Sequence, residues 1–397
     1  MRVTSKRSAI TALAGANGVR LTADASAVVR DPAIDIVCEL IGGIEPARSL
    51  ILEAIALRKH VVTANKALLA QHGTEIFAAA HAKGVMVAFE AAVAGGVPII
   101  KALREGLTAN RIEWIAGIIN GTSNFILSRM RETGASFETV LAEAQALGYA
   151  ESDPTYDVEG IDAAHKLAIM SAIAFGVPMQ FDKAYAEGIT KLTREDLRYA
   201  EELGYRIKLL GITRRARNGI ELRVHPTLIP AKRLIANVEG AMNAVLVKGD
   251  AVGSTLYYGA GAGAEPTASA VIADLVDVTR MHTADPEHRV PHLAFQPDQL
   301  TDLPFLPMGE VETSYYLRMR VDDRPGVLAD ITRILADRNI SIDAMIQKEP
   351  PEGEDQTDII LLTHKSIERD VDDAIRRIEA LSTVRGKVIR IRLEDLG

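Results

Sequence analysis

Residues 34–66 read IDIVCELIGGIEPARSLILEAIALRKHVVTANK, and this stretch decides the fold class. The apolar run from Ile34 to Ile41 ends at two glycines, which predicts a buried parallel strand followed by a tight turn. A helix is expected over residues 46–59 and a short strand over residues 60–63. Strand, helix and strand in this order predict a doubly wound parallel sheet.

The same alternation continues with a helix over residues 66–83 and a strand over residues 85–90. Ligands of such sheets collect beyond the carboxyl ends of the strands. The residues expected along that edge are Gly42, Gly43, Asn65, Lys66 and Glu90.

Residues 101–283 are predicted to form a second, α+β domain, in which a sheet carries helices on one face. Its first strand is expected at residues 111–120, after a short helix that follows Pro98. The other expected elements are helices at 136–147 and 160–175 and strands at 205–212, 220–227, 241–248 and 253–258.

Five prolines between residues 284 and 308 and weak apolar periodicity predict a linker. After it, the pattern predicts βαββαβ, a ferredoxin-like module. The predicted organisation is therefore a nucleotide-binding domain at 1–100, a substrate, catalytic and dimerisation domain at 101–283, a linker at 284–312 and a regulatory domain at 313–397.

Composition and charge argue against some classes of function for this chain. The chain has 397 residues and a formal net charge of -8, and it has no long basic stripe, so nucleic acid is not expected as its main partner. No apolar window is long enough for a membrane helix. The single cysteine, Cys38, lies in the apolar run and is expected to be a buried small hydrophobe, which suits a reducing cytoplasm.

An acidic segment, LGYAESDPTYDVEGIDAAHK at residues 147–166, carries five carboxylates. A solvated acidic loop is one interpretation. However, helical periodicity begins at Gly160, so Asp162 and Lys166 fall four apart on a helix that otherwise looks buried. A buried lysine beside a carboxylate suits proton transfer. Asp157 and Glu159 precede the helix, and a purely structural role at its N-terminus stays open for both.

The last 80 or so residues resemble an ACT domain, a module that commonly binds amino acids. The resemblance rests on DRPGVLA at residues 323–329 and NISI at residues 339–342. It implies an amino-acid effector near Gly326 and Asn339. Gly326 would allow close backbone approach, and the helix N-terminus would offer N–H groups to a carboxylate. A dimerisation role without a ligand is the alternative.

Most of the chain from Ile34 onward resembles homoserine dehydrogenase. Besides the acidic segment, the resemblance rests on VVTANKALLA, FEAAVAGGVPII, GIINGTSNFIL and YYGAGAGAEPTASAVIADL, which begin at residues 61, 89, 117 and 257. It implies NAD(P)-dependent interconversion of L-aspartate 4-semialdehyde and L-homoserine, with threonine as the expected effector and a homodimer or homotetramer as the expected assembly.

The resemblance also implies roles for individual residues. Lys166 would be the proton donor, supported by Lys66 and Asp162, while Glu151 and Asp157 would hold the substrate ammonium group. A structural Na⁺ or K⁺ would bind at Glu90, Val93, Gly95 and Val97, largely through backbone carbonyls. The cofactor, NADP or NAD, would contact Ile41, Gly42, Gly43, Lys66, Gly261 and Gly263.

One feature departs from the family pattern, because no G-x-G-x-x-G turn follows a first strand. We therefore expect the first β-α-β unit to be lacking, either through a start codon placed too late or through a real truncation. Lys6 and Arg7 would read a ribose 2′-phosphate, which favours NADP. Two alternatives are a cofactor-deficient amino-acid-binding regulator and a dehydrogenase for another amino-acid aldehyde.

Overall fold

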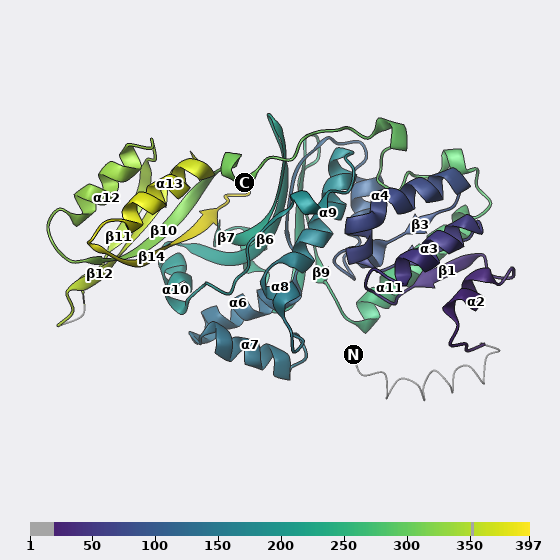
Figure 1. Cartoon of the computed structure of the whole chain (residues 1–397), viewed down its shortest axis with the longest axis horizontal. Coiled ribbons are helices and arrows are strands. Elements are labelled where there is room, and N and C mark those ends of the chain that lie inside the picture. Colours follow the sequence, from purple (N-terminus) through teal and green to yellow (C-terminus); the bar gives the residue numbers. More distant parts are fainter. Residues whose placement is uncertain (1–19, 351–352) are drawn as a thin grey trace.

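The computed structural model describes residues 20–350 and 353–397. Figure 1 shows an elongated molecule in which a small parallel sheet, a larger central sheet and a C-terminal α/β module follow one another along the longest axis. In the described ranges, no helix combines the length and the apolar character required to cross a membrane.

The parallel sheet confirms the doubly wound pattern. Its strands lie in the order β1-β2-β3 and are all parallel. Alternate residues of β2 face opposite layers, because Val61 packs with helices α3 and α4 while Val62 packs with helix α11. Helix α11 was not predicted, and it brings a segment distant in sequence onto this sheet (Figure 1). The elements are β1 (Ile36–Glu39), β2 (His60–Thr63), β3 (Val87–Ala88), α2 (Ala25–Arg30), α3 (Ala47–Ala56), α4 (Lys66–Lys83) and α11 (Ala264–Met281).

The apolar run that suggested this sheet is less buried than predicted. Strand β1 ends at Glu39, whose carboxylate accepts the amides of Ile41 at 2.8 Å and Gly42 at 3.1 Å and so turns the chain. Leu40 and Ile41 are each 57% exposed. Cys38 is also exposed, so its predicted burial is wrong. Among the described residues β1 is an edge strand, which explains why its apolar side chains meet solvent.

The central sheet is antiparallel, in the order β7-β6-β4-β8-β9. All five predicted strands are present, whereas helices α6 and α10 were not predicted. Helix α9 packs against β6 and β7, and it also contacts α4 of the neighbouring sheet. The elements are β4 (Ile112–Ile118), β6 (Tyr205–Ala216), β7 (Gly219–Pro230), β8 (Met242–Gly249), β9 (Gly253–Ala260), α6 (Gly121–Thr133), α7 (Phe137–Ala146), α8 (Thr155–Val158), α9 (Ile161–Phe175), β5 (Tyr185–Ala186) and α10 (Arg194–Glu202).

The C-terminal module has the predicted βαββαβ order, with strands arranged β11-β12-β10-β14. Its edge strand joins the central sheet, because β14 pairs in parallel with β7 through Arg392–Thr227 and Leu393–Leu228. Figure 1 shows this yellow strand reaching the central layer. The elements are β10 (Glu312–Asp322), α12 (Val327–Ala336), β11 (Ile342–Gln347), β12 (Gln356–Thr363), α13 (Glu368–Glu379) and β14 (Val384–Leu393).

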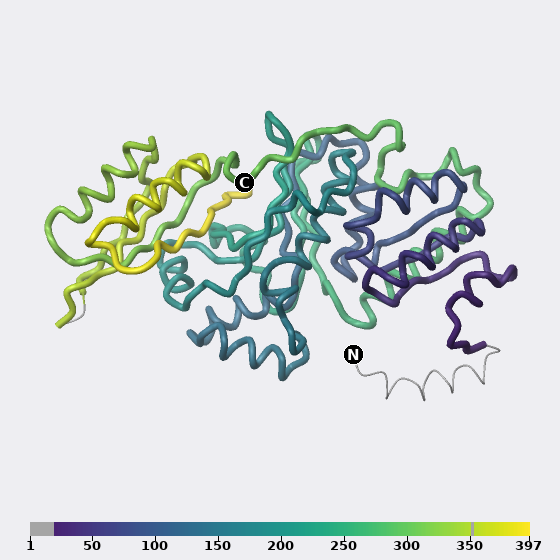
Figure 2. Tube along the Cα trace, in the orientation of Figure 1, coloured from purple at the N-terminus to yellow at the C-terminus, as the bar shows by residue number. Residues whose placement is uncertain are grey.

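The proline-rich segment between α11 and β10 lies against the rest of the molecule. The Thr301 amide donates to the Gly176 carbonyl at 2.7 Å, and the Ile220 amide donates to the Pro304 carbonyl at 2.9 Å. At its start, His292 accepts the amide of Val87 at 3.1 Å. Figure 2 shows the segment running along one side of the molecule from the parallel sheet toward the C-terminal module. The segment is thus held by the parallel sheet through the His292 side chain, and by the end of α9 and strand β7 through its backbone.

Candidate active site

Helix α9 carries the core of the candidate site. It begins after Gly160, which has φ 79°, and a Cβ there would lie 3.0 Å from the Val224 side chain. Glycine therefore suits both the left-handed turn and the close packing. The helix is buried around nearly its whole circumference, as its apolar sequence predicts. Asp162 and Lys166 consequently project from one face of a helix held between two sheets.

Two lysines surround the Asp162 carboxylate. Lys166 Nζ lies 2.7 Å from Asp162 Oδ2 and 2.8 Å from the Ile119 carbonyl oxygen. Lys66 Nζ, at the start of α4, lies 3.2 Å from Asp162 Oδ1. Asp162 is 6% exposed and Lys166 9%. Burial acts to raise the pKa of Asp162, but the charges of Lys166 and Lys66 outweigh it and hold that pKa well below its usual range.

Asn120 joins the acidic groups, and sequence reasoning did not assign it a role. Its amide nitrogen donates to Asp157 Oδ1 at 2.7 Å and to Asp162 Oδ2 at 2.9 Å. Its amide oxygen accepts the Ser123 amide at 2.8 Å, which makes Asn120 the N-cap of α6. An asparagine directly after a strand and before a helix could have signalled this cap. Burial raises the pKa of the neighbouring Asp157.

The rest of the acidic segment lies outside this cluster. The Glu151 side chain is exposed, and its carboxylate has no hydrogen bond or ion pair with any residue that the structure describes. Glu159 accepts a hydrogen bond from Thr190 at 2.9 Å, and Asp153 accepts the Thr155 amide at 3.1 Å. The structure therefore brings Asp157 toward Asp162 and the lysines but gives Glu151 no contact with them.

In contrast to the exposed Glu151, His165 is buried. Its ring is fully buried, 4.1 Å from the Phe181 ring centroid and 6.1 Å from that of Tyr156. Neither ring nitrogen has a hydrogen-bond partner within residues 20–350 and 353–397. Burial lowers the pKa of His165 to about 4, so the ring packs in its neutral form near neutral pH.

The carboxyl edge of the parallel sheet has an open backbone. Gly42 and Gly43 have φ of 78° and 75°, and a Cβ at either would meet no atom within 4 Å. Asn65 donates to the Gly43 carbonyl at 2.7 Å and caps α4 through the Leu68 amide at 3.2 Å. This turn and the exposed Ile41 suit a dinucleotide, whose phosphates need close backbone approach and whose rings need apolar contact. Lys6 and Arg7 lie outside the described residues.

The second glycine-rich turn is shaped by contacts within the protein. A Cβ at Gly261 would lie 1.9 Å from the Asn243 amide nitrogen, and one at Gly95 would lie 2.6 Å from the Gly261 carbonyl oxygen. Gly263 has φ 123° and immediately precedes α11. These glycines let the segment after β3 pack against the end of β9.

Glu90 lies at the expected cation site, where its carboxylate binds backbone amides. Its two carboxylate oxygens accept the amides of Ile100 at 2.9 Å and Lys101 at 2.8 Å, at the start of α5 (Ile99–Lys101). Burial raises the pKa of Glu90 to about 7. In the part of the chain that the structure describes, His, Cys, Asp and Glu form no group of three or more that could hold a metal ion. A monovalent cation would therefore depend on backbone carbonyls, as expected for Val93, Gly95 and Val97.

The two residues expected at the effector site lie at opposite ends of α12. Gly326 has φ 96°, precedes the helix and leaves open space where a Cβ would stand. Asn339 has φ 56°, and its amide donates to the Ala336 carbonyl after the helix ends. Gly326 exposes the N-terminus of α12, whereas Asn339 forms a left-handed turn at the other end.

Comparisons with known proteins decide the family. The homoserine dehydrogenase model matches residues 98–276, the model of the homoserine dehydrogenase NAD binding domain matches residues 2–90, and the ACT domain model matches residues 315–383. The chain belongs to the homoserine dehydrogenase family. It is 65% identical over 377 residues to homoserine dehydrogenase of Pseudomonas aeruginosa, covering 95% of this chain and 87% of the relative. The Neisseria gonorrhoeae enzyme is 60% identical, with coverages of 94% and 87%.

Solved structures agree with this membership. A homoserine dehydrogenase structure from Thiobacillus denitrificans is 74% identical, with a TM-score of 0.93, covering 100% of this chain and 89% of that one. A hyperthermophilic archaeal homoserine dehydrogenase in complex with NADPH is 25% identical, with a TM-score of 0.60 and coverages of 70% and 82%.

The family establishes an NAD(P)-dependent oxidoreductase that interconverts L-aspartate 4-semialdehyde and L-homoserine. The alternative of a cofactor-deficient regulator is not favoured. The NAD-binding match begins at residue 2, so the expectation that the first β-α-β unit is lacking is not supported. Residues 1–19 lie outside the part of the chain that the structure describes.

Proposed function

We propose that Lys166 donates the proton in the reduction of the aldehyde, and the observation that carries this is its buried contact with Asp162. An ammonium group has three N–H donors. Ile119 and Asp162 take two of them, which leaves a third for a substrate oxygen. When bound, the nicotinamide cofactor supplies hydride to the aldehyde carbon. Lys166 then stabilises the growing negative charge on the oxygen and protonates it.

Asp162 and Lys66 would support this step. Asp162 accepts from Lys166 and lies 3.2 Å from Lys66 Nζ, so it orients both lysines. Lys66 is more exposed than Lys166 and stands at the cofactor edge of the parallel sheet. It therefore suits a position between substrate and cofactor.

Asp157 would hold the substrate ammonium group. Asn120 donates to one of its carboxylate oxygens, and the other oxygen would accept from the substrate. We add Asn120 as a positioning residue, because one amide group links Asp157 with Asp162. Glu151 is proposed as a second ammonium ligand. Its exposed side chain would have to turn toward Asp157 when substrate binds.

The remaining assignments are proposals supported by the resemblance and the local geometry. The cofactor would contact Ile41, Gly42, Gly43, Lys66, Gly261 and Gly263, with Lys6 and Arg7 favouring NADP. Backbone carbonyls of Val93, Gly95 and Val97 near Glu90 would hold Na⁺ or K⁺.

At the level of the whole protein, we propose threonine as the effector of the ACT domain, with Gly326 and Asn339 near its site. A homodimer or homotetramer is the proposed assembly. The proposed domains are 1–100, 101–283, a linker at 284–312, and 313–397. The proposed location is the cytoplasm, where Cys38 would stay reduced.

The decisive experiment for the proton donor is Lys166→Ala. We expect kcat to fall by about 100-fold or more, since positioned acids contribute that much, while the Kd of NADPH measured by fluorescence stays within about threefold. Lys365→Ala, at an exposed lysine that follows β12 in the C-terminal module, should leave both quantities unchanged. Near-normal turnover of a folded Lys166→Ala variant would show that Lys166 is not the proton donor.

A further inference from the structure

The C-terminal module holds a carboxylate of the central domain through a buried arginine. Arg392, on β14, is fully buried. Its Nη1 donates to Glu187 Oε2 at 2.9 Å, and its Nη2 donates to the Tyr185 hydroxyl at 3.2 Å. Its Nε donates to Glu368 Oε2 at 2.9 Å, at the start of α13. One guanidinium thus joins the C-terminal module to β5 and the residue that follows it.

Glu187 is held by both its side chain and its backbone. The Tyr185 hydroxyl donates to Glu187 Oε2 at 2.6 Å, and the Glu187 amide donates to the Val224 carbonyl of β7 at 2.8 Å. Arg390, also on β14, lies 3.9 Å from the same carboxylate oxygen. Hydrogen bonds between charged groups are stronger than those between neutral groups. Two arginines of the C-terminal module therefore help to fix this carboxylate.

The three residues that follow lie against the end of α8. A Cβ at Gly188 would lie 2.3 Å from the Val158 carbonyl oxygen, so glycine is required for this close approach. The Ile189 amide donates to the same carbonyl at 2.8 Å, and Thr190 Oγ1 donates to Glu159 Oε1 at 2.9 Å. The last carbonyl groups of a helix have no partner within it, so the Ile189 amide supplies one from outside.

Helix α8 depends on such contacts because it has only four residues. A helix this short is not stable by itself. Asp157 is its third residue, and Ser123 Oγ donates to the Asp157 carbonyl oxygen at 2.9 Å. The place of the Asp157 carboxylate therefore depends on the start of α6 and on residues 188–190.

We propose that Glu187 is a positioning residue for substrate binding, through which Arg392 fixes Asp157 where it can accept from the substrate ammonium group. This inference rests on the proposed role of Asp157. It makes the C-terminal module part of the substrate half of the site, with or without an effector. Loss of the contact should weaken substrate binding. Proton transfer should continue, because Ile119 and Asp162 hold the Lys166 ammonium group.

Variants at each end of the contact test the proposal in the full-length protein. Glu187→Ala should raise the KM of L-aspartate 4-semialdehyde about tenfold, while kcat and the Kd of NADPH stay within about threefold. Glu187→Gln should lie closer to the wild type, because its amide oxygen can still accept from Arg392. Arg392→Lys should also raise KM, since lysine lacks the planar fork that reaches Glu187 and Glu368 together.

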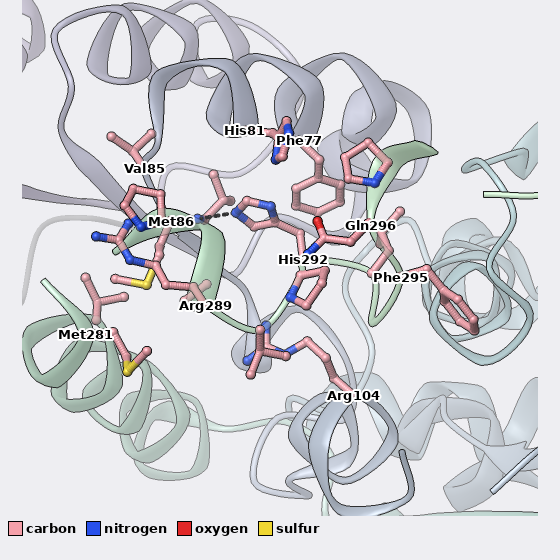
Figure 3. A pocket seen from close by; sticks show the side chains of 18 of the residues that line it. Phe77, His81, Val85, Met86, Arg104, Met281, Arg289, His292, Phe295 and Gln296 are labelled. Atoms are coloured by element: carbon pink, nitrogen blue, oxygen red, sulfur yellow. Dashed lines mark hydrogen bonds between the residues drawn. The ribbon is translucent and has the colours of Figure 1, made fainter. Parts of the chain in front are cut away.

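Two control variants separate this contact from general effects. Glu202→Gln alters an exposed carboxylate of α10 that pairs with Lys348 of the C-terminal module at 2.6 Å, and it should leave KM unchanged. Leu293→Ala controls for lost stability. Leu293 is buried in the wall of a cavity of about 460 Å³ (Figure 3), which neither Glu187 nor any residue of α8 lines. This variant should lower the melting temperature without raising KM.

A double-mutant cycle shows whether Glu187 acts through Asp157. Asp157→Asn alone should raise KM, and Glu187→Ala added to it should raise KM little further. An unchanged KM in Asp157→Asn would overturn the proposed role of Asp157 and this inference with it. A raised KM in Asp157→Asn beside an unchanged KM in Glu187→Ala, or independent effects in the double variant, would overturn this inference alone. Should Glu187→Ala fail to fold, Glu187→Gln and Arg392→Lys decide in the same cycle.

Discussion

Lys66 Nζ lies 3.2 Å from Asp162 Oδ1, which connects the first residue of α4 on the parallel sheet with α9 on the central sheet. The other oxygen of the same carboxylate accepts from Lys166 at 2.7 Å. One buried acid thus joins the carboxyl edge of the parallel sheet to the proposed proton donor. The relative placement of two sheets is therefore part of the site.

Asp162→Asn should damage turnover more than folding. The substitution preserves the shape but removes the charge that orients both lysines. We expect kcat to fall about 100-fold while the Kd of NADPH changes little. Steady-state kinetics and cofactor titration measure the two effects. Asp182→Asn, which alters an exposed acid paired with Lys183, is the matched control; a similar loss there would contradict the assignment.

Asn120→Ala should affect both the site and the stability of α6. The loss of a helix cap costs about 1 kcal/mol, and the loss of the amide that links Asp157 with Asp162 should lower kcat about tenfold or more. Ser136→Ala removes the N-cap of α7, far from the lysines, and should lower the melting temperature without changing kcat. If the two variants lose stability equally and both retain full activity, Asn120 is a cap and nothing more.

Glu394 should make the stability of the protein sensitive to acid. Burial acts to raise its pKa, but Arg223 and Arg214 outweigh burial and lower it from 4.5 to about 2. Since the folded pKa lies below the unfolded one, ionised Glu394 contributes stability above pH 4.5, and this contribution is lost as the pH falls toward 2.

Glu394→Gln should therefore destabilise the protein by about 3 kcal/mol near neutral pH, because buried Arg223 and partly buried Arg214 each lose one of their two carboxylate neighbours. The difference from the wild type, measured by urea unfolding, should narrow at about pH 3. Glu312→Gln, at an exposed position of β10, should behave as the wild type at both pH values. A difference that does not change with pH would show that the ionisation of Glu394 is not its source.

Gly326→Ala should weaken the proposed inhibition by threonine. The added methyl group meets no atom, but φ 96° is unfavourable for alanine, so the turn before α12 should shift. We expect the threonine concentration for half-inhibition to rise about tenfold with basal kcat unchanged. Gly134→Ala carries a comparable φ of 66° in the central domain and should leave inhibition intact. Absence of threonine inhibition in the wild type would refute the effector assignment.

Local spacing explains why half of the site could be predicted. Asp162 and Lys166 are four apart on a helix with a clear apolar period, so their contact follows from helix geometry. Asn120 is 42 residues from Asp162 in sequence, and nothing in its neighbourhood indicated that they would meet. Cys38 was misjudged for a related reason, because a continuous apolar run does not tell whether a strand is central or at an edge.

The sequence by itself determined the alternation of strands and helices, the βαββαβ module and the Asp162–Lys166 pair, since each depends on contacts between near neighbours in the chain. Only the tertiary structure decided that α11 covers the parallel sheet, that β14 extends the central sheet through Arg392 and Thr227, and that Lys66 reaches Asp162. These contacts join segments tens to hundreds of residues apart. Packing of whole layers creates them, and no local periodicity encodes which layers will meet.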